Sequence, residues 1–189
     1  MFKNIMVTGG AGFIGSNFVR LIINERKDYN VINYDKLTYA GNLENLDDIK
    51  NNDRYTFVKG DIADFERVSE TLKKYDIDVI INFAAETHVD RSIMGAVDFI
   101  KTDVEGVYVL LEAARLRGGL KRFIQISTDE VYGSVEIGYS KETDTLMPRN
   151  PYSASKAGGD RIAYSFFATY NMDVIITRAS NNYGPYQYP

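Results

Sequence analysis

The sequence contains no cysteine and a single histidine, His88. Without cysteine the chain can form no disulfide, no thiolate nucleophile and no cysteine-based metal site, which is compatible with a reducing cytoplasm. One histidine rules out a multi-histidine metal centre within one chain, so we expect no metal. For His88 itself a structural role is the simpler interpretation. We therefore expect a cytoplasmic protein whose chemistry depends on other side chains.

Long apolar runs and excess positive charge are also missing. No stretch approaches the roughly 18 consecutive apolar residues of a membrane span, and glycines interrupt the apolar start, unlike in a signal peptide. The formal net charge is −4, so no broad basic field favours nucleic acid as a partner. With 189 residues, 44% hydrophobic and 25% charged, the composition predicts one ordinary globular domain.

Apolar β-branched runs alternate with amphipathic stretches along the chain. The expected strands are Ile5–Thr8, Val31–Asp35, Tyr55–Lys59, Val79–Phe83, Phe123–Ser127 and Val174–Arg178. The expected helices are Phe13–Arg26, Asp64–Tyr75, Ile93–Arg117 and Pro151–Tyr170. This alternation predicts an α/β fold, a doubly wound and mostly parallel sheet covered on both faces. Right-handed crossovers then place the ligand crevice at the carboxyl ends of the strands.

A glycine-rich stretch, "VTGGAGFIG", follows the first expected strand and opens the first helix. It contains Gly10-x-Gly12-x-x-Gly15 and also Gly9-x-x-Gly12-x-x-Gly15. Such glycines allow a tight turn and a backbone bare enough to approach a pyrophosphate, which meets the N–H groups and the positive end of the helix. A glycine triplet alone is often only a turn, so its context decides.

Acidic residues after the next two strands supply that context. Asp35 ends the second expected strand, about 20 residues past the last glycine, where an acid holds the ribose hydroxyls of a dinucleotide. Asp61 follows the third strand and can hydrogen-bond the adenine amino group. Because Asp35 should repel a 2′-phosphate, NAD is favoured over NADP. The neighbouring Lys36 weakens that preference. The order of strand, glycines, helix and acid predicts an NAD-binding Rossmann fold.

A tyrosine and a lysine lie four residues apart in "RNPYSASKAGG". Tyr152 and Lys156 share one face of a helix that Asn150 can cap and Pro151 can begin. The helix dipole and the lysine ammonium both favour a phenolate, so we expect the pKa of Tyr152 to be lowered toward working pH. Such a tyrosine can exchange a proton with a substrate hydroxyl. Since the chain has 14 tyrosines, a chance match is the alternative.

Two adjacent carboxylates end an apolar strand in "FIQISTDEVYG". Asp129 and Glu130 follow Thr128, and they form either a solvated turn or an acid and a base directed at a substrate. Two neighbouring carboxyls cannot both ionise cheaply in a partly dry cleft, so their pKa values should separate.

Several stretches together resemble the extended short-chain dehydrogenase/reductase family. They are "TGGAGFIG", "STDEVYG", "YSASKAGGD" and "RASNNYGPYQYP". "YDKLTYAGNLENL" and "NFAAETHVDRSI" extend the resemblance over essentially all 189 residues, to the branch that dehydrates dTDP-glucose. A 4-epimerase of this family is expected to carry a smaller, non-acidic pair in place of Asp129 and Glu130. GDP-mannose dehydratases and UDP-glucuronate decarboxylases typically show Ser-Glu there, without the aspartate.

The resemblance implies a role for each residue of the two motifs. Tyr152 removes the proton of the glucose 4-hydroxyl, and Lys156 tunes it and holds the nicotinamide ribose. Glu130 removes the C5 proton, Asp129 protonates the departing 6-hydroxyl, and Thr128 hydrogen-bonds the 4-oxygen. The hydride that the nicotinamide took up during oxidation of the 4-hydroxyl then returns to C6, which gives the 4-keto-6-deoxy sugar.

The resemblance also assigns contacts and a partner. The residues that match cofactor contacts are Gly9, Gly12, Phe13, Ile14, Gly15, Asp35, Lys36, Thr38, Asp61, Ile62, Ala84, Ala85, Thr102, Tyr152, Lys156 and Asn182. The substrate-contacting positions are Thr87, Thr128 and Asn181. Two expected helices, Ile93–Arg117 and Pro151–Tyr170, are similar to those that form a four-helix homodimer interface.

Members of that branch continue past the position of Pro189 with a segment that supplies most of the sugar-nucleotide pocket. We therefore expect residues 1–189 to form the NAD-binding domain, with the substrate-binding segment largely absent and turnover of dTDP-glucose weak or lost. Two alternatives stay open. One is a non-catalytic NAD-binding module, and the other is a different nucleotide-sugar dehydratase or an epimerase.

Overall fold

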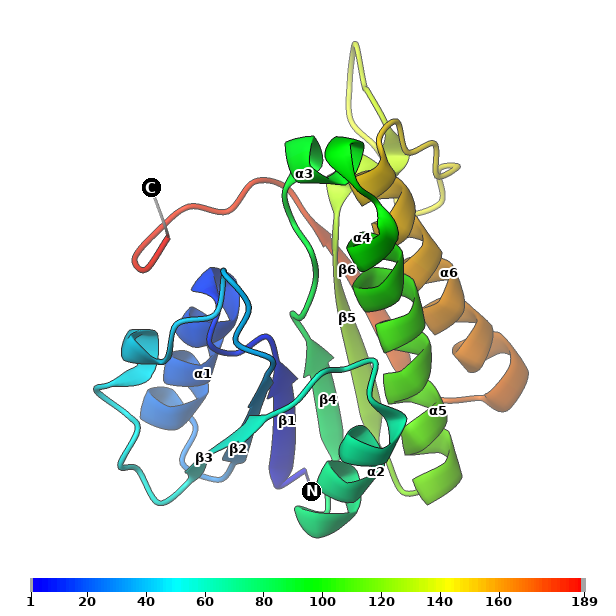
Figure 1. Ribbon diagram of the computed structural model, residues 1–189. Coiled ribbons are helices and arrows are strands. Elements are labelled where there is room, and N and C mark those ends of the chain that lie inside the picture. Colours follow the sequence, from blue (N-terminus) through cyan, green and yellow to red (C-terminus); the bar gives the residue numbers. More distant parts are fainter. Residues whose placement is uncertain (1, 188–189) are drawn as a thin grey trace.

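The computed structural model describes residues 2–187 and contains one six-stranded parallel sheet (Figure 1). The strand order is β3-β2-β1-β4-β5-β6, and every neighbouring pair is parallel. The strands are β1 Asn4–Thr8, β2 Asn30–Asp35, β3 Tyr55–Lys59, β4 Val79–Asn82, β5 Arg122–Thr128 and β6 Val174–Ala179. All six predicted strands are thus confirmed, with ends that differ by one residue at most.

The helices also follow the predicted order, with one correction. They are α1 Phe13–Glu25, η1 Leu43–Leu46, α2 Phe65–Lys74, α3 Val89–Met94, α4 Val97–Ile100, the π-helical turn η2 Lys101–Gly106, α5 Val107–Arg117, η3 Asp129–Tyr132 and α6 Pro151–Tyr170. The prediction of one helix from Ile93 was wrong. Gly95 has an extended backbone and ends α3, so the continuous helical rod begins only at Val97.

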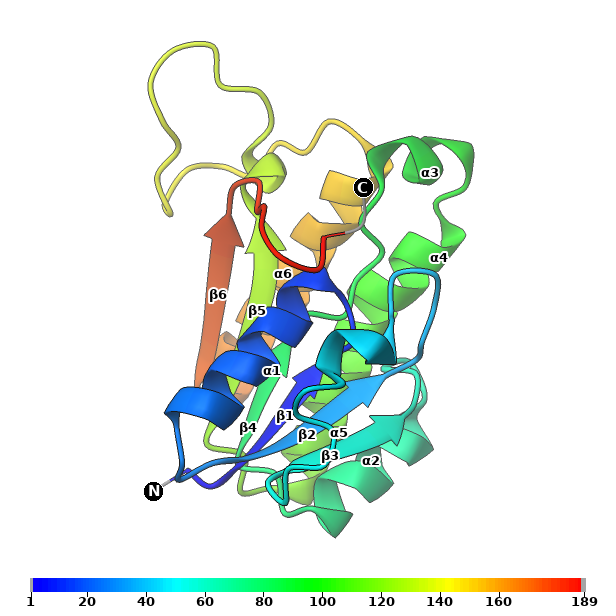
Figure 2. The same ribbon diagram turned by 90° about the vertical axis from the view of Figure 1, so that its left-hand side faces the viewer.

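Helices cover both faces of the sheet, as predicted (Figures 1 and 2). Helix α1 packs on one face, and α2, α5 and α6 pack on the other. The first core joins apolar residues of α1 and η1 to the strands, among them Val7, Val19 and Val31. The second joins the other three helices to Met6, Ile80, Phe123 and their neighbours. The inner strands β1, β2 and β4 are buried on both faces, which explains their mostly apolar sequences. In β5 and β6 burial alternates along the strand, so one face of these strands is more exposed.

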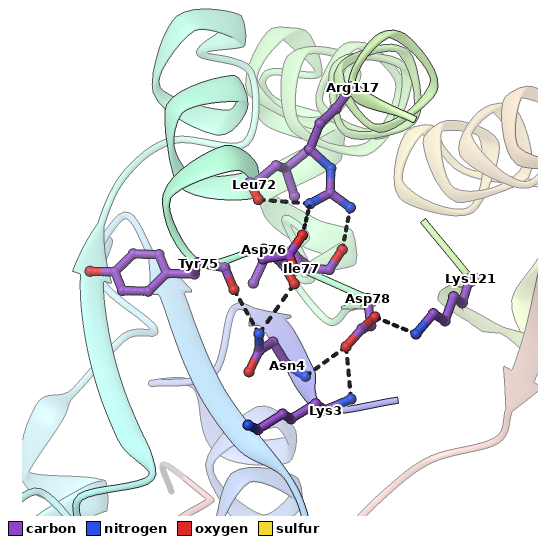
Figure 3. Close-up of polar contacts among 9 residues, drawn as sticks. All are labelled: Lys3, Asn4, Leu72, Tyr75, Asp76, Ile77, Asp78, Arg117 and Lys121. Atoms are coloured by element: carbon purple, nitrogen blue, oxygen red, sulfur yellow. Dashed lines mark hydrogen bonds and ion pairs between the residues drawn. The ribbon is translucent and has the colours of Figure 1, made fainter. Parts of the chain in front are cut away.

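A polar cluster at the amino edge of the sheet fixes β1 beside β4 (Figure 3). The Asp78 carboxylate accepts the backbone N–H groups of Lys3 at 2.7 Å and Asn4 at 3.0 Å, and it pairs with the Lys121 ammonium at 2.7 Å. Burial raises the pKa of Asp78, but these hydrogen bonds and the lysine charge together hold it at about 2. The start of β1 is therefore anchored to the start of β4 at neutral pH.

The chain reverses its winding direction between β1 and β4. After β1 it enters α1 on one face, and after β4 it enters α3 and the helical rod on the other. Loops leaving these adjacent strands diverge, which creates a ligand crevice in open α/β sheets. Buried Thr8, Asn82 and Gln125 link β1, β4 and β5 by side-chain hydrogen bonds just below it. Within residues 2–187 no helix is both long and apolar enough to cross a membrane.

Candidate functional site

The glycine-rich loop makes a tight turn after β1. Gly9 has φ +65°, and its N–H donates to the Tyr34 carbonyl at 3.0 Å. A Cβ on Gly9 would lie 2.7 Å from the backbone nitrogen of Ala84, and a Cβ on Gly15 would overlap the Gly9 carbonyl. Gly12 closes the turn by donating its N–H to that carbonyl at 3.1 Å. The packing of the turn therefore requires glycine at positions 9 and 15.

Helix α1 begins directly above this turn with unoccupied donors. Gly12 is the N-cap and provides no side-chain acceptor, and the first turn holds no acid. Ser16 makes the first intrahelical bond, to the Gly12 carbonyl at 2.9 Å. The preceding N–H groups of Phe13, Ile14 and Gly15 therefore have no intrahelical acceptor. Together with the positive end of the helix dipole they form a site suited to a phosphate group.

Asp35 lies at the end of β2, against the glycine loop. Its carboxylate is 8% exposed and accepts two backbone N–H groups, from Ala11 at 2.9 Å and Leu37 at 2.8 Å. Burial raises the pKa of Asp35, and these two hydrogen bonds oppose that rise. The carboxylate is thus held in one orientation beside the phosphate site, where a ribose would follow. Thr38 is exposed on the same loop.

Lys36 points away from Asp35 and pairs with Asp61. Their ammonium and carboxylate lie 2.7 Å apart, and Asp61 also accepts the Ala63 N–H at 3.0 Å. Burial raises the pKa of Asp61, but the Lys36 contact, the Ala63 N–H and the Lys101 charge together lower it below its ordinary value. The lysine charge is therefore engaged away from the acid that would meet the ribose. Ile62 is buried and contacts Gly106, so only its backbone can face the crevice.

The loop after β4 forms the other side of the crevice. Ala84 and Ala85 are partly buried and Thr87 is exposed. The Ala84 N–H donates to the Thr8 hydroxyl at 3.4 Å, which keeps this loop beside the glycine turn. Thr102 is partly buried in the π-helical turn η2.

Strand β5 delivers the acidic pair at the same edge of the sheet. The Thr128 hydroxyl accepts the Glu130 N–H and donates to the Asp129 carboxylate, both at 3.3 Å. Asp129 is exposed and Glu130 is half-buried. The Asn150 amide donates to Glu130 at 3.2 Å, so the N-cap of α6 orients this carboxylate. The division of the pair into an acid and a base stays a prediction.

The start of α6 is the predicted one. Asn150 accepts the Ser153 N–H at 2.8 Å while the Ser153 hydroxyl accepts the Asn150 N–H at 3.2 Å, a capping box. Pro151 occupies the first helical position. Tyr152 is therefore placed in the first turn, above the end of β5.

The pKa of Tyr152 is opposite to the prediction. Burial raises it, the Thr128 hydrogen bond lowers it, and the nearby carboxylates raise it, to about 12 in total. These carboxylates are Glu130, Asp103 and Asp129. Lys156 is 4% exposed and donates its ammonium to the Ile126 carbonyl at 2.8 Å. The Lys156 ammonium is thus engaged with β5, and burial of the phenol together with the nearby carboxylates raises the pKa of Tyr152 instead of lowering it.

An open groove of about 620 Å³ adjoins these residues at the ends of β5 and β6. Asp129, Glu130 and Arg178 line its floor, and the loop between η3 and α6 forms a wall with Val135 and Tyr139. Arg178 pairs with the fully buried Asp160 at 2.9 Å. The groove has a mixed polar and apolar lining, and its volume is large enough for a sugar.

The segment after β6 crosses above the carboxyl edge and reaches α1 (Figure 1). The Asn17 amide donates to the Pro185 carbonyl at 2.9 Å, and the Arg20 guanidinium lies 3.8 Å from the centre of the Tyr186 ring. Asn181 and Asn182 are exposed along this crossing. The structure thus brings the predicted site residues to the carboxyl edge of the sheet.

Sequence reasoning missed Asp103. Its carboxylate is 1% exposed and accepts the Glu86 N–H at 3.1 Å and the Ser155 hydroxyl at 2.7 Å. Burial raises the pKa of Asp103 to about 6, although the Lys156 charge and both hydrogen bonds lower it. The sequence contains one signal by which Asp103 could have been identified as buried. Asp103 lies four residues from Phe99 and Val107, on the face of the helical rod that those residues bury.

The sheet order and the loop geometry define a class of fold. A parallel sheet in the order 3-2-1-4-5-6, with a glycine turn after the first strand and an acid after the second, is a Rossmann-type dinucleotide-binding fold. The family model for GDP-mannose 4,6 dehydratase matches residues 6–189. The chain belongs to this family.

Comparison with known proteins places several dehydratases close to this chain. It is 51% identical over 186 residues to the low-salt glycan biosynthesis protein Agl12 of Haloferax volcanii, covering 98% of the chain and 59% of the relative. It is 48% identical to the dTDP-glucose 4,6-dehydratase of Escherichia coli, covering 98% and 56%. The crystal structure of dTDP-glucose 4,6-dehydratase from Bacillus anthracis in complex with NAD superposes with a TM-score of 0.91 at 47% identity, covering 99% and 57%. The chain thus spans little more than half the length of these proteins.

Substitution of Gly15 should disturb the loop on which the phosphate site depends. The Cβ of Gly15→Ala would overlap the Gly9 carbonyl, and overpacking of this kind costs about 1–3 kcal/mol. Gly95→Ala is the control, because a Cβ there meets nothing within 4 Å. Urea unfolding should show a lower free energy of unfolding for Gly15→Ala and little change for Gly95→Ala. Equal stability of the two variants would contradict the described packing.

The raised pKa of Asp103 predicts a pH-dependent stability. Between the unfolded pKa of 3.8 and the folded pKa of about 6 the native state binds more protons than the unfolded state. The free energy of unfolding, relative to Asp103→Asn, should therefore fall as pH rises through this window, by on the order of 3 kcal/mol. Above this pH window the difference in free energy of unfolding between the two chains should be constant. Denaturant titrations of both chains at several pH values measure it, and a difference that grows with pH would show the opposite shift.

Proposed function

We propose that this chain is the NAD-binding and catalytic part of a nucleotide-sugar 4,6-dehydratase acting on dTDP-glucose. The observation that carries the proposal is a shared helix start. The N-cap Asn150 holds Glu130, and one turn of the same helix places Tyr152, whose phenol is hydrogen-bonded by Thr128. The start of helix α6 thus positions both Tyr152, which would act in the oxidation, and Glu130, which would act in the elimination. The relatives named dTDP-glucose 4,6-dehydratase support the choice of reaction.

The residues at the crevice fit a dinucleotide. The N–H groups at the start of α1 would bind the pyrophosphate, and glycine at positions 9 and 15 allows the tightly packed turn that presents them. Asp35 would accept the ribose hydroxyls, and its charge disfavours a 2′-phosphate. Because the Lys36 ammonium pairs with Asp61, its charge is already engaged and does not attract the 2′-phosphate of NADP. The further contacts predicted for NAD are Lys36, Thr38, Asp61, Ile62, Ala84, Ala85, Thr102, Lys156 and Asn182.

When bound, NAD would supply the hydride acceptor for C4 of the sugar and the hydride donor for C6. The chain's own residues move the protons. Tyr152 takes the proton of the 4-hydroxyl, and Thr128 hydrogen-bonds both the phenol and the 4-oxygen. The pKa of about 12 means that the phenol is protonated at neutral pH in this chain. The proton transfer therefore requires an added positive charge or the loss of one of the nearby negative charges.

Elimination needs one group that takes a proton and another that gives one. Glu130 takes the C5 proton once the 4-ketone has made it acidic, and Asp129 gives a proton to the 6-oxygen, so that water leaves. When C6 is reduced, Glu130 returns its proton to C5. Glu130 is half-buried and held by Asn150, whereas Asp129 is exposed at the groove. A fixed base and an accessible acid suit these roles. Thr87 and Asn181 would contact the sugar nucleotide.

A cofactor assay tests the first half of the proposal. We expect NADH fluorescence to saturate with this chain, NADPH to bind more weakly, and Asp35→Ala to weaken NADH by about tenfold, because it removes hydrogen bonds to a charged group. Asp53→Ala, an exposed acid on the loop before β3, is the control and should bind normally. Equal affinity for NADH and NADPH would refute the role of Asp35.

Mass spectrometry of the reaction separates the alternatives. With NAD and dTDP-glucose, any product should have lost one water, and Glu130→Gln should stop its formation without changing NADH affinity. A product of unchanged mass would indicate an epimerase. Saturable NADH binding without any product would indicate a non-catalytic module.

We also propose a homodimer formed through the helical rod and α6. Large apolar side chains are about half exposed on adjacent faces of α5 and α6, where Tyr108 contacts Phe166 at 6.2 Å between ring centres. The exposed members are Tyr108, Leu116, Tyr164, Phe167 and Tyr170. Exposed apolar side chains gathered on neighbouring helices are typical of protein interfaces. The cytoplasmic location stays a prediction of the sequence.

Light scattering at micromolar concentration tests the dimer. We expect twice the mass of the chain, and Phe167→Glu should halve it because a charge would be buried at the interface. Ile137→Glu, on the 95% exposed Ile137 of the loop before α6, should leave the dimer intact. A native chain that scatters as a monomer would contradict the proposal.

A further inference from the structure

Asp103 lies where three parts of the site meet. It belongs to the π-helical turn η2, it accepts the Glu86 N–H of the loop after β4, and it accepts the Ser155 hydroxyl of α6. Helix α6 packs directly on this turn, because a Cβ on Gly159 would overlap the Asp103 carbonyl. Single π-turns inside helices occur frequently at functional sites. The buried Asp103 carboxylate therefore joins the loop after β4 to helix α6, which carries Tyr152 and Lys156.

The charges around Asp103 show why a carboxylate is needed there. The Lys156 ammonium is 4% exposed and acts on Asp103 electrostatically. The other buried acid near this lysine, Asp160, is paired with Arg178 at 2.9 Å. A buried ammonium is costly unless a negative charge balances it. The remaining ionisable groups that face Asp103 or respond to its charge are Glu86 and Tyr152.

We propose that Asp103 is a charged positioning residue for the Tyr152–Lys156 pair. Its two hydrogen bonds hold the loop after β4 against the first turns of α6, and its charge keeps the Lys156 ammonium beside β5, directed at the Ile126 carbonyl. The proposal deepens the proposed function and rests on it for the roles of Tyr152 and Lys156.

Two substitutions separate the shape of Asp103 from its charge. Asp103→Asn keeps the size and can still accept the Glu86 N–H, but it lacks the charge. Asp103→Ala removes both hydrogen bonds as well. Glu105→Gln is the matched control, because it removes one negative charge from an exposed position in the same turn.

Three readouts on the 189-residue chain test the proposal. Hydrogen exchange of the Glu86 amide should quicken in Asp103→Ala and stay near native in Asp103→Asn. The Tyr152 ring carbon signal, assigned with Tyr152→Phe, should titrate at lower pH in Asp103→Asn, because a nearby negative charge is lost, and should not move in Glu105→Gln. NADH affinity should fall by about tenfold in Asp103→Ala, the loss expected when a buried polar group is left without its partner.

The outcomes distinguish this inference from the function on which it rests. If the native chain fails to bind NADH, the proposed function is wrong, whereas the exchange and the titration still decide the place of Asp103. An unchanged Tyr152 titration in Asp103→Asn, or native exchange of Glu86 in Asp103→Ala, would overturn the inference. If Asp103→Ala does not fold, the Tyr152 titration in Asp103→Asn alone decides, because a merely structural role would leave it unmoved.

Discussion

The parallel pairing of β1 with β4 is the constraint on which the rest of the structure depends. Asp78 anchors the two strands at the amino edge, and Thr8 and Asn82 join them below the carboxyl edge. With this register fixed, the Gly9 turn meets Ala84 so closely that no side chain fits between them. The loops then diverge to opposite faces of the sheet, and the crevice between them is a consequence of the pairing.

Helix α6 brings a second set of groups to that crevice. Its capping box fixes the first turn, its N-cap orients Glu130, and its buried Lys156 points at β5. Asp103 links this helix to the loop after β4. One buried carboxylate thus connects the proposed dinucleotide site with the proposed catalytic residues on α6. The electrostatics of the site follow from the close packing of charged side chains around Tyr152. Burial of the Tyr152 phenol raises its pKa, and several nearby carboxylates raise it further, so a bound cofactor or substrate must act against both effects.

The sequence predicts the fold well because its signals are local. The inner strands β1, β2 and β4 are buried on both faces and appear as mostly apolar runs, and Asn150 with Pro151 marks the start of α6. The break at Gly95 was missed, because one glycine within an apolar stretch does not reveal where a helix ends. Asp103 and the direction of Lys156 were missed for another reason. Both depend on contacts between segments far apart in the chain, such as those of Asp103 with Glu86 and Ser155.

A titration with NAD followed by backbone amide signals tests the central claim most directly. The claim is that one edge of the sheet unites the dinucleotide loop with the Tyr–Lys and Thr–Asp–Glu motifs. Saturable shifts are expected at residues 9–15 and 35–38, together with Ala84, Thr128 and Tyr152, whereas Lys3 and Asp78 at the opposite edge should not move. Saturable shifts confined to the amino edge, or no shift at residues 9–15, would contradict it.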